Sequence, residues 1–145
     1  MTKIFLFLLV FFIYVGNVYA QHTEHHSVSP KNKVKELTFK GVLEAQLSDD
    51  ILKDYSMQSS LMTVPAGFVD SVAHRHDADL FGYVINGKIV IALEGEGAKT
   101  YTAGQMFHET KNILHTRLEN LNSNATADVL LIFIIRKGAS SYIKE

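Results

Sequence analysis

The sequence predicts an all-β domain, either a sandwich or a small barrel, and three observations support this prediction. Short apolar or alternating runs follow one another from about residue 36 onward. Turn residues, mainly Gly, Asn and Asp, separate these runs. The chain also shows no internal repeat. At least seven short strands at this spacing are typical of antiparallel β structure.

The expected strands, in chain order, cover residues 37–43, 55–64, 80–85, 88–93, 99–102, 106–109, 113–118 and 129–135. The strongest turn signal is Ile-Asn-Gly-Lys at residues 85–88, which predicts a type I′ hairpin because Asn-Gly tolerates two positive φ angles. Helix is expected, at most, at residues 47–54, where Ser48 could cap a turn.

The first twenty residues have the features of a secretory signal peptide. A single charge at Lys3 precedes an apolar run over residues 4–15, and small residues lead to Ala20. The apolar run is short for a membrane-spanning helix. We therefore expect cleavage after Ala20 and a mature chain that is secreted or periplasmic and free of the membrane.

Residues 21–33 form a polar stretch that contains Pro30 and three histidines, His22, His25 and His26. This composition predicts a disordered leader, with one folded domain over residues 34–145. The leader histidines are interpreted as solvated tail residues, with metal scavenging as the alternative.

Charge and cysteine content exclude several function classes. The chain carries 14 Lys+Arg, 15 Asp+Glu and no Cys, so its formal net charge is −1. A chain without an excess of Lys and Arg lacks the positive charge that binding to the phosphates of nucleic acid requires. Without thiolates, any metal must be held by imidazole, carboxylate or carbonyl groups.

Three histidines outside the leader have the spacing of a metal site. His74 and His76 flank Arg75, and alternate residues of an extended strand point to the same face. His115 follows on a later strand. His108 lies beside Glu109 and is expected to face the other way, in a structural or rim position.

This pattern resembles the cupin superfamily, whose two motifs flank a hairpin. The residues that carry the resemblance are Gly67, His74, His76 and Gly87 for the first motif, and Gly104 and His115 for the second. The resemblance extends over about residues 57–133, with Thr110, Asn112 and Glu119 at the positions of the family's Pro, Gly and Asn. It implies a single-domain jelly-roll barrel, a double-stranded β-helix.

The resemblance also implies a mononuclear site in which His74, His76 and His115 hold one divalent transition metal. Iron is the first expectation, with zinc, manganese, nickel or copper as alternatives. Leu80 occupies the position at which many cupins have a metal-binding Glu. Glu109 is the first candidate to replace it, as a fourth ligand or as an acceptor that orients an imidazole; the alternative places Glu109 at the rim or surface.

Glu109, Tyr83 and Arg117 are the candidate catalytic residues. Tyr83 could hydrogen-bond a ligand from the barrel wall, although an aromatic filling the barrel is the simpler interpretation. Arg117 shares the face of His115 if that strand is regular, and could then receive a substrate anion. Its alternative is an outward ion pair with Glu119.

Three functions remain open at this level. The first is an iron-dependent, dioxygenase-type oxidoreductase that acts on a small organic molecule. The second is a non-catalytic cupin that binds a metal or a small ligand. The third is a metal-free, sugar-binding or epimerase-like cupin. The resemblance also implies a homodimer.

Overall fold

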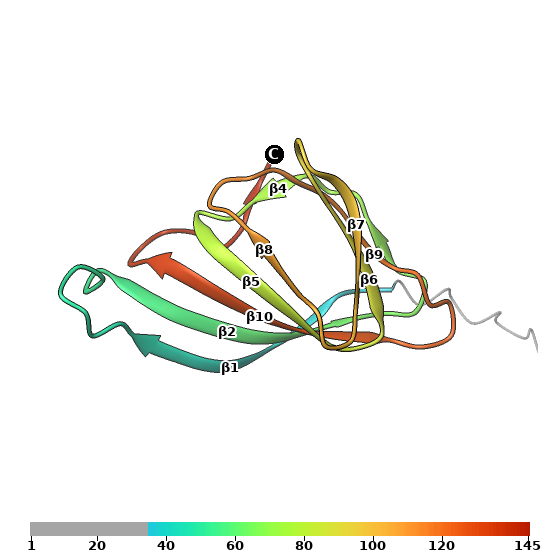
Figure 1. The fold of residues 1–145 in the computed structure, drawn as a ribbon, viewed down its shortest axis with the longest axis horizontal. Coiled ribbons are helices and arrows are strands. Elements are labelled where there is room, and N and C mark those ends of the chain that lie inside the picture. Colours follow the sequence, from blue (N-terminus) through green and yellow to red (C-terminus); the bar gives the residue numbers. More distant parts are fainter. Residues whose placement is uncertain (1–34) are drawn as a thin grey trace, which may run out of the picture. The chain divides into compact units, whose positions relative to one another are not determined.

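The computed structural model describes residues 35–145, which fold into two antiparallel β-sheets (Figure 1). The first sheet has the strand order β1 (Thr38–Gln46), β2 (Tyr55–Val64), β10 (Ala127–Arg136), β5 (Ala78–Asn86) and β8 (Met106–Glu109). The second has the order β11 (Ile143–Lys144), β4 (His74–Arg75), β9 (His115–Asn120), β6 (Lys88–Leu93) and β7 (Gly97–Thr102), with β3 (Val69–Asp70) also paired to β9. The predicted signal peptide and leader lie outside the described residues.

The all-β prediction is confirmed, because residues 35–145 contain strands and turns and no helix. Within that part of the chain, no helix is therefore available to cross a membrane. The helix considered for residues 47–54 is wrong. These residues form a turn in which the Asp49 side chain accepts a hydrogen bond from the Ile51 amide (2.8 Å). An aspartate that binds the backbone two residues on favours such a turn over a helix.

The predicted hairpin at residues 85–88 is also wrong. Strands β5 and β6 belong to different sheets, so Gly87 makes a corner between sheets. Gly87 has a φ of 85°, and a Cβ atom there would lie 2.7 Å from the Cβ of Ala127. The Asn-Gly pair correctly marks a bend in the chain. The strands on either side of it pair with other strands, β5 with β10 and β6 with β9, and not with each other.

The core lies where the two sheets face each other. Its buried members are Met62, Val64, Leu80, Val84, Ile89, Ile91, Leu93, Phe107, Leu118, Ala127, Val129 and Leu131. Burial of each large aliphatic side chain contributes about 1.5–3 kcal/mol to folding. Phe107 packs directly over Gly82, where a Cβ atom would meet its ring at 2.0 Å. These contacts fix the position of β8 beside β5, and Glu109 follows on β8.

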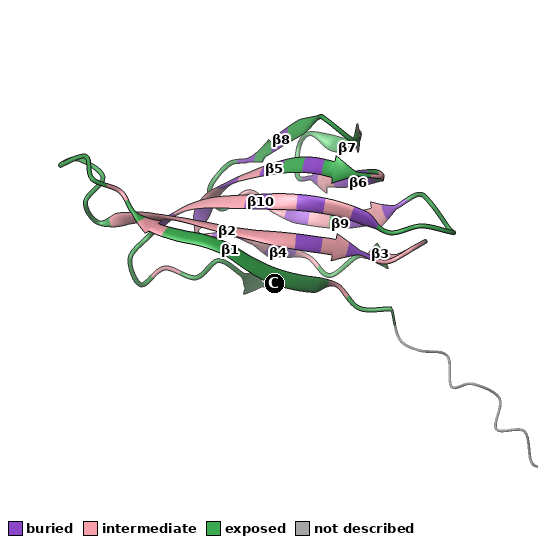
Figure 2. Cartoon of the chain, turned by 90° about the horizontal axis from the view of Figure 1, so that it is seen from below, coloured by how far each residue is buried: buried purple, intermediate pink, exposed green. Residues whose placement is uncertain are grey.

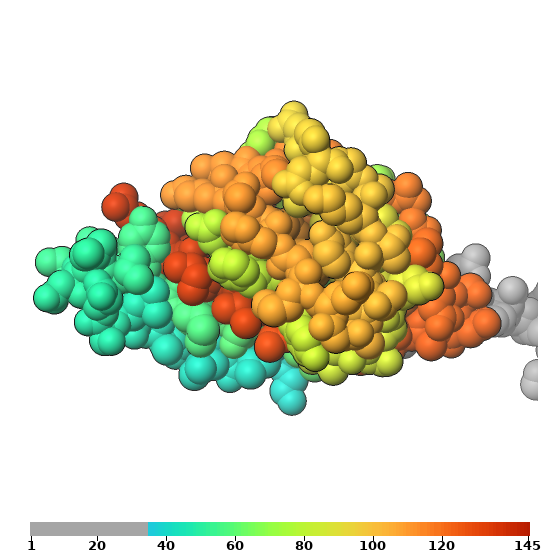
Figure 3. Space-filling model, in the orientation of Figure 1, coloured from blue at the N-terminus to red at the C-terminus, as the bar shows by residue number. Residues whose placement is uncertain are grey.

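Burial is uneven along the first sheet (Figure 2). Strand β1 and residues 55–61 of β2, here called the overhang, contain no buried residue. The connection between these two strands projects beyond the rest of the domain (Figure 3). The buried residues of β2 are Met62 and Val64, at the end of the strand that the second sheet covers.

Candidate metal centre

His74 and His76 approach the interior of the barrel from the short strand β4. His74 lies within the strand and His76 directly follows it, and the two residues are 9% and 8% exposed. Arg75, between them, points outward and pairs with Glu145 (2.6 Å). The alternation expected for an extended segment therefore puts both imidazoles on the inner face.

His115 joins this pair from β9. It is the direct cross-strand partner of His74, and the centroids of the two rings lie 4.7 Å apart. One nitrogen from each of His74, His76 and His115 lies within 4.8 Å of the other two. The structure thus brings together the three histidines that the sequence singled out.

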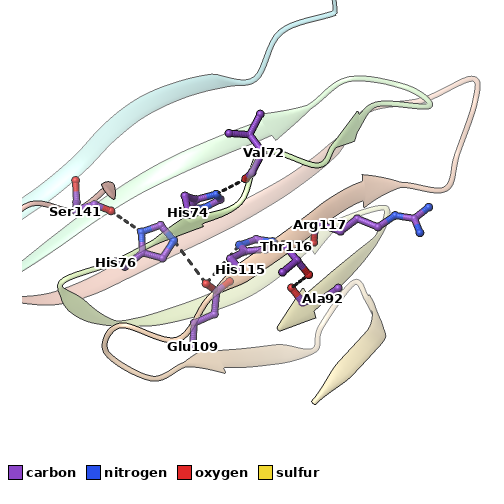
Figure 4. A network of polar contacts seen from close by, with 9 residues as sticks. All are labelled: Val72, His74, His76, Ala92, Glu109, His115, Thr116, Arg117 and Ser141. Carbon is purple, nitrogen blue, oxygen red and sulfur yellow. Dashed lines mark hydrogen bonds and ion pairs between the residues drawn. The ribbon is translucent and has the colours of Figure 1, made fainter. Parts of the chain in front are cut away.

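Glu109 completes the cluster from the end of β8. Its side chain is almost fully buried, and its Oε2 atom lies 3.5 Å from His76 Nε2 and 3.5 Å from His115 Nδ1 (Figure 4). The rim or surface alternative for Glu109 is wrong. In the register of β5 and β8, Glu109 lies opposite Leu80. The neighbouring strand therefore presents a carboxylate beside the position where the first motif lacks one.

Each imidazole donates one N–H to a backbone carbonyl. The donor and acceptor pairs are His74 Nδ1 with Val72 O (2.9 Å), His115 Nε2 with Arg117 O (2.7 Å), and His76 Nδ1 with Ser141 O. A carbonyl oxygen only accepts, so each of these nitrogens carries a proton. In the neutral imidazoles, the second nitrogen then has a lone pair that faces the cluster, which is the arrangement typical of metal-ligating histidines.

The polar atoms at the centre of the cluster fit a cation. Among the described residues, the buried atoms Glu109 Oε2 and His115 Nδ1 have no hydrogen-bond partner. Lone pairs of neutral imidazoles facing a carboxylate repel one another, and leaving buried polar atoms unsatisfied costs about 1–3 kcal/mol each. A divalent ion would satisfy all four groups. Imidazole and carboxylate donors suit iron, zinc, manganese and nickel.

The pKa values of two histidines shift in opposite directions. Burial lowers the pKa of His74, and the neighbouring imidazoles add to this effect. Burial also acts to lower the pKa of His115, but the Glu109 carboxylate and the Arg117 carbonyl more than offset it, so that pKa is raised. A metal binds the unprotonated Nδ1 atom of His115, so protonation of this imidazole competes with metal binding.

An apolar cavity of about 410 Å³ surrounds the four groups. Its apolar lining residues are Leu37, Phe39, Met62, Leu80, Ile91, Phe107, Leu118, Leu131 and Phe133. Apart from the four central residues, Asp70, Ser141 and Tyr142 supply its polar groups. Within the described part of the chain, neither Lys nor Arg lines this cavity.

Two of the three candidate catalytic residues lie outside this site. Tyr83 faces outward between the buried Gly82 and Val84, so it neither fills the barrel nor lines the cavity. Arg117 makes the outward ion pair with Glu119. The expected shared face of His115 and Arg117 is wrong because β9 is irregular.

The irregularity is a β-bulge at Thr116. Ala92 and Leu93 on β6 are consecutive, but they pair with Arg117 and His115, which leaves Thr116 as an extra residue. A bulge reverses which side chains point inward. The residues that are buried further along β9 are consequently Leu118 and Asn120, not Arg117 and Glu119. The side-chain amide nitrogen of Asn120 donates to the carbonyls of Val64, Pro65 and Ala125, at 2.9–3.2 Å.

Sequence reasoning missed Ser141 and Tyr142. Ser141 supplies the carbonyl that holds His76, and the Tyr142 ring stacks on His74 with centroids 4.6 Å apart. Neither residue belongs to a recognisable motif, and both are more than sixty residues from the histidines they contact. His108, by contrast, lies on the outer face, where it pairs with Asp79 (2.9 Å).

Comparison with known protein families gives one match within this chain. The family described as "Cupin domain" matches residues 60–133, which include the three histidines and Glu109. Among curated proteins, no sequence matches the chain.

Several solved structures share its fold. KdgF from a Halomonas species is 22% identical, with a TM-score of 0.55, over 70% of this chain and 81% of its own. The cupin domain of Cnp3 from Schizosaccharomyces pombe is 12% identical, with a TM-score of 0.54, over 68% and 64%. A mutant of the Bacillus subtilis oxalate decarboxylase OxdC is 20% identical, with a TM-score of 0.52, over 61% of this chain. The match spans 23% of the decarboxylase chain, and at these identities the likeness concerns the fold.

Proposed function

The chain belongs to the cupin family, its two facing sheets form the jelly-roll barrel of that fold, and we propose that it is a metal-dependent enzyme. Its substrate would be a small, largely apolar organic molecule that binds through oxygen atoms. With iron as the metal, the reaction would be of the dioxygenase type.

The observation that carries this proposal is the arrangement of the four central residues. His74, His76 and His115 would hold one divalent ion, and Glu109 would be the fourth ligand. Each imidazole is fixed by a backbone carbonyl so that its unprotonated nitrogen faces the centre. Such preset orientation favours metal binding because little conformational freedom remains to be lost.

The lining of the cavity supports the substrate class. A volume of about 410 Å³ falls within the ordinary range of small-molecule pockets, and the walls are mostly aliphatic and aromatic. The charged lining groups outside the histidines, Asp70 and Glu109, are both acidic. A substrate with several negative charges would meet no protein cation here, so a neutral molecule or a monoanion fits best.

In this proposal, the apolar residues bind the substrate and the four central residues bind the metal. Apolar side chains such as Leu80 and Phe133 hold the hydrocarbon part of the substrate and keep water out. The histidines and Glu109 fix the metal, and Glu109 offsets part of its charge. Bound iron would supply activation of O2, whereas zinc or manganese would supply polarisation of a substrate oxygen without redox chemistry.

The sugar-binding alternative has less support. Recognition of a sugar needs polar groups matched to many hydroxyls, and the walls away from the four central residues are largely apolar. The non-catalytic alternative remains as an outcome of experiment. It requires a closed metal site with no position left for a substrate.

Cobalt substitution tests the proposal. We would load the protein with Co²⁺ and record its visible absorption before and after adding benzohydroxamate, an aromatic probe with two oxygen donors, beside oxalate. The proposal predicts a spectral change with benzohydroxamate at concentrations at which oxalate has none. A Co²⁺ spectrum that neither probe alters would overturn the enzyme proposal and support a closed, non-catalytic site. For the dioxygenase form, the iron-loaded protein should consume O2 with an aromatic enol or diketone.

The location of the protein is part of the same proposal. We propose that residues 1–20 direct export and that the mature chain begins at Gln21. Expression of the full chain in a secreting host, followed by N-terminal sequencing, should return Gln21 as the first residue. Recovery of the whole chain with Met1 or Thr2 first would contradict this.

A further inference from the structure

The segment of residues 140–145, here called the C-terminal segment, lies along β4. Its strand β11 pairs with β4, with Ile143 opposite Arg75 and Lys144 opposite His74. Two further backbone hydrogen bonds extend this pairing, from Asp77 N to Ser140 O and from Glu145 N to Ala73 O, each 3.1 Å. The C-terminal segment therefore holds the chain on both sides of residues 74–76, which include His74 and His76.

Two of its residues touch the histidines themselves. The Ser141 carbonyl accepts the hydrogen bond from His76 Nδ1 (Figure 4). The Tyr142 ring stacks on His74, with an angle of 27° between the two planes. The Ser141 contact fixes the tautomer of His76, and the Tyr142 contact fixes the orientation of the His74 ring. The two contacts therefore act on two different ligands of the proposed metal.

An ion pair also joins the C-terminal segment to β4: Arg75 donates from Nε to Glu145 Oε1 (2.6 Å). Arg75 also donates from Nη1 to the carbonyl of Asn112 (2.6 Å), which anchors the arginine itself. Within the segment, the Ser140 hydroxyl donates to the Tyr142 carbonyl (2.7 Å). Because an exposed ion pair contributes little by itself, the backbone pairing with β4 is the main attachment of the segment.

The C-terminal segment supplies no residue to the hydrophobic core. Its contacts are with β4, with the cavity and with exposed polar groups. Removal of the segment should consequently leave the two sheets folded while it frees the rings of His74 and His76.

We propose that the C-terminal segment is a positioning element of the metal site. This inference rests on the proposed function, because it assumes that the histidines hold a metal. The Ser141 carbonyl keeps the proton of His76 on Nδ1, and Tyr142 keeps the His74 ring turned toward the centre. Loss of such supporting contacts typically weakens metal affinity by about 10–100-fold.

The test compares the parent with a variant that ends at Ala139, with Tyr142→Ala and Tyr142→Phe, and with Lys144→Ala as a matched control. Lys144 lies in the same C-terminal segment, its side chain is exposed, and Lys144→Ala leaves the backbone pairing with His74 in place. Zinc affinity would be measured by competition with a chromophoric chelator, and the fold by circular dichroism. The variant ending at Ala139 should bind zinc about 10–100-fold more weakly. Tyr142→Ala should show part of this loss, and Tyr142→Phe and Lys144→Ala little of it.

A second readout separates positioning from general loosening of the fold. In the metal-free protein, ¹⁵N shifts of the imidazoles report which nitrogen carries the proton. His76 should be locked as the Nδ1–H tautomer in the parent and should become a mixture of tautomers in the variant ending at Ala139. Should that variant fail to fold, Tyr142→Ala and Arg75→Ala carry the test.

The outcomes are distinguishable. A parent that binds no zinc overturns the proposed function. A parent that binds zinc, together with shortened, Tyr142→Ala and Arg75→Ala variants that bind it equally well, overturns the role of the C-terminal segment alone.

Discussion

Two regions of the first sheet show what an opposing layer does to a strand. In β5, which faces the second sheet, residues 78, 80, 82 and 84 are buried and their neighbours are not. In the overhang, Phe39 and Val42 each remain 60% exposed. Both regions have strand-forming sequences and antiparallel pairing, each with one register shift. The difference teaches that alternation creates a buried face only where another layer covers it.

The same comparison explains where the chemistry lies. His74, His115 and Glu109 are buried because β4 and β9 of the second sheet close over the covered end of the first sheet, where β8 forms its edge. Burial strengthens the mutual influence of charged and polar groups, because less water screens them. Of the overhang residues, Phe39 alone lines the cavity, and it remains largely exposed.

The largest expected effect on stability comes from the covered end. Ile89 is fully buried in the core, and Ile89→Ala should lower the free energy of unfolding by about 2–5 kcal/mol. Chemical denaturation of the metal-free protein would measure it. A loss below about 1 kcal/mol, the usual effect of a point change, would mean that the core is not where the structure places it.

Metal should stabilise the covered end and leave the overhang unchanged. At a free-metal concentration 100 times Kd, binding adds about 2.7 kcal/mol to the free energy of unfolding. A chelator should remove this gain, and hydrogen exchange should report added protection in β4, β8 and β9. If metal protects the amides of β1 from hydrogen exchange as strongly as those of β4, β8 and β9, the covered end and the overhang do not differ in the way proposed.

Glu109 should account for a large part of the metal affinity. Glu109→Gln keeps the size of the side chain and removes its charge, and we expect zinc to bind at least about 10–100-fold more weakly. Asp79→Asn is the matched control, since Asp79 is an outward-facing carboxylate paired with His108. If Glu109→Gln and Asp79→Asn bind zinc with equal affinity, Glu109 is not a metal ligand and its role is structural.

The smallest expected effect lies in the overhang. Val42→Ala removes exposed apolar surface, and the free energy of unfolding should change by no more than about 0.5 kcal/mol. A larger loss that grows with protein concentration would indicate that another chain covers this surface. Denaturation at two protein concentrations separates these results.

The homodimer implied by the family resemblance stays a prediction. Sedimentation velocity of the metal-loaded protein should show a species of twice the chain mass. A single monomeric species across the micromolar range would remove this expectation and leave the metal site unaffected.

Local patterns predicted the strands and the pairing of His74 with His76, and the resemblance to the cupins added the jelly-roll barrel and His115. The alternation of apolar residues marked the strands, and the spacing of His74 and His76 marked a shared face. The partners of the strands could not be predicted in the same way. The Asn-Gly bend at Gly87 is local, but the choice of β10 and β9 as partners depends on contacts far along the chain.

The predictions that were wrong or missing at the site also depend on contacts between distant parts of the chain. One extra residue, Thr116, reversed the face of Arg117, and nothing local in the sequence marks that bulge. The burial of Glu109 depends on β8 lying beside Leu80, which only the register reveals. Ser141 and Tyr142 lie just before a strand of only two residues, Ile143–Lys144, and so short a strand shows no hydrophobic periodicity in the sequence.

Elemental analysis most directly tests whether the histidine cluster holds one metal ion. Residues 21–145 would be purified untagged, without added metal, beside the His74→Ala/His115→Ala double variant and a His108→Ala control. We predict about one equivalent of a transition metal in the parent and in the control, and none in the double variant. A parent that is empty and takes up no iron, zinc, manganese, nickel or copper on titration, or a double variant that retains its metal, would contradict the account.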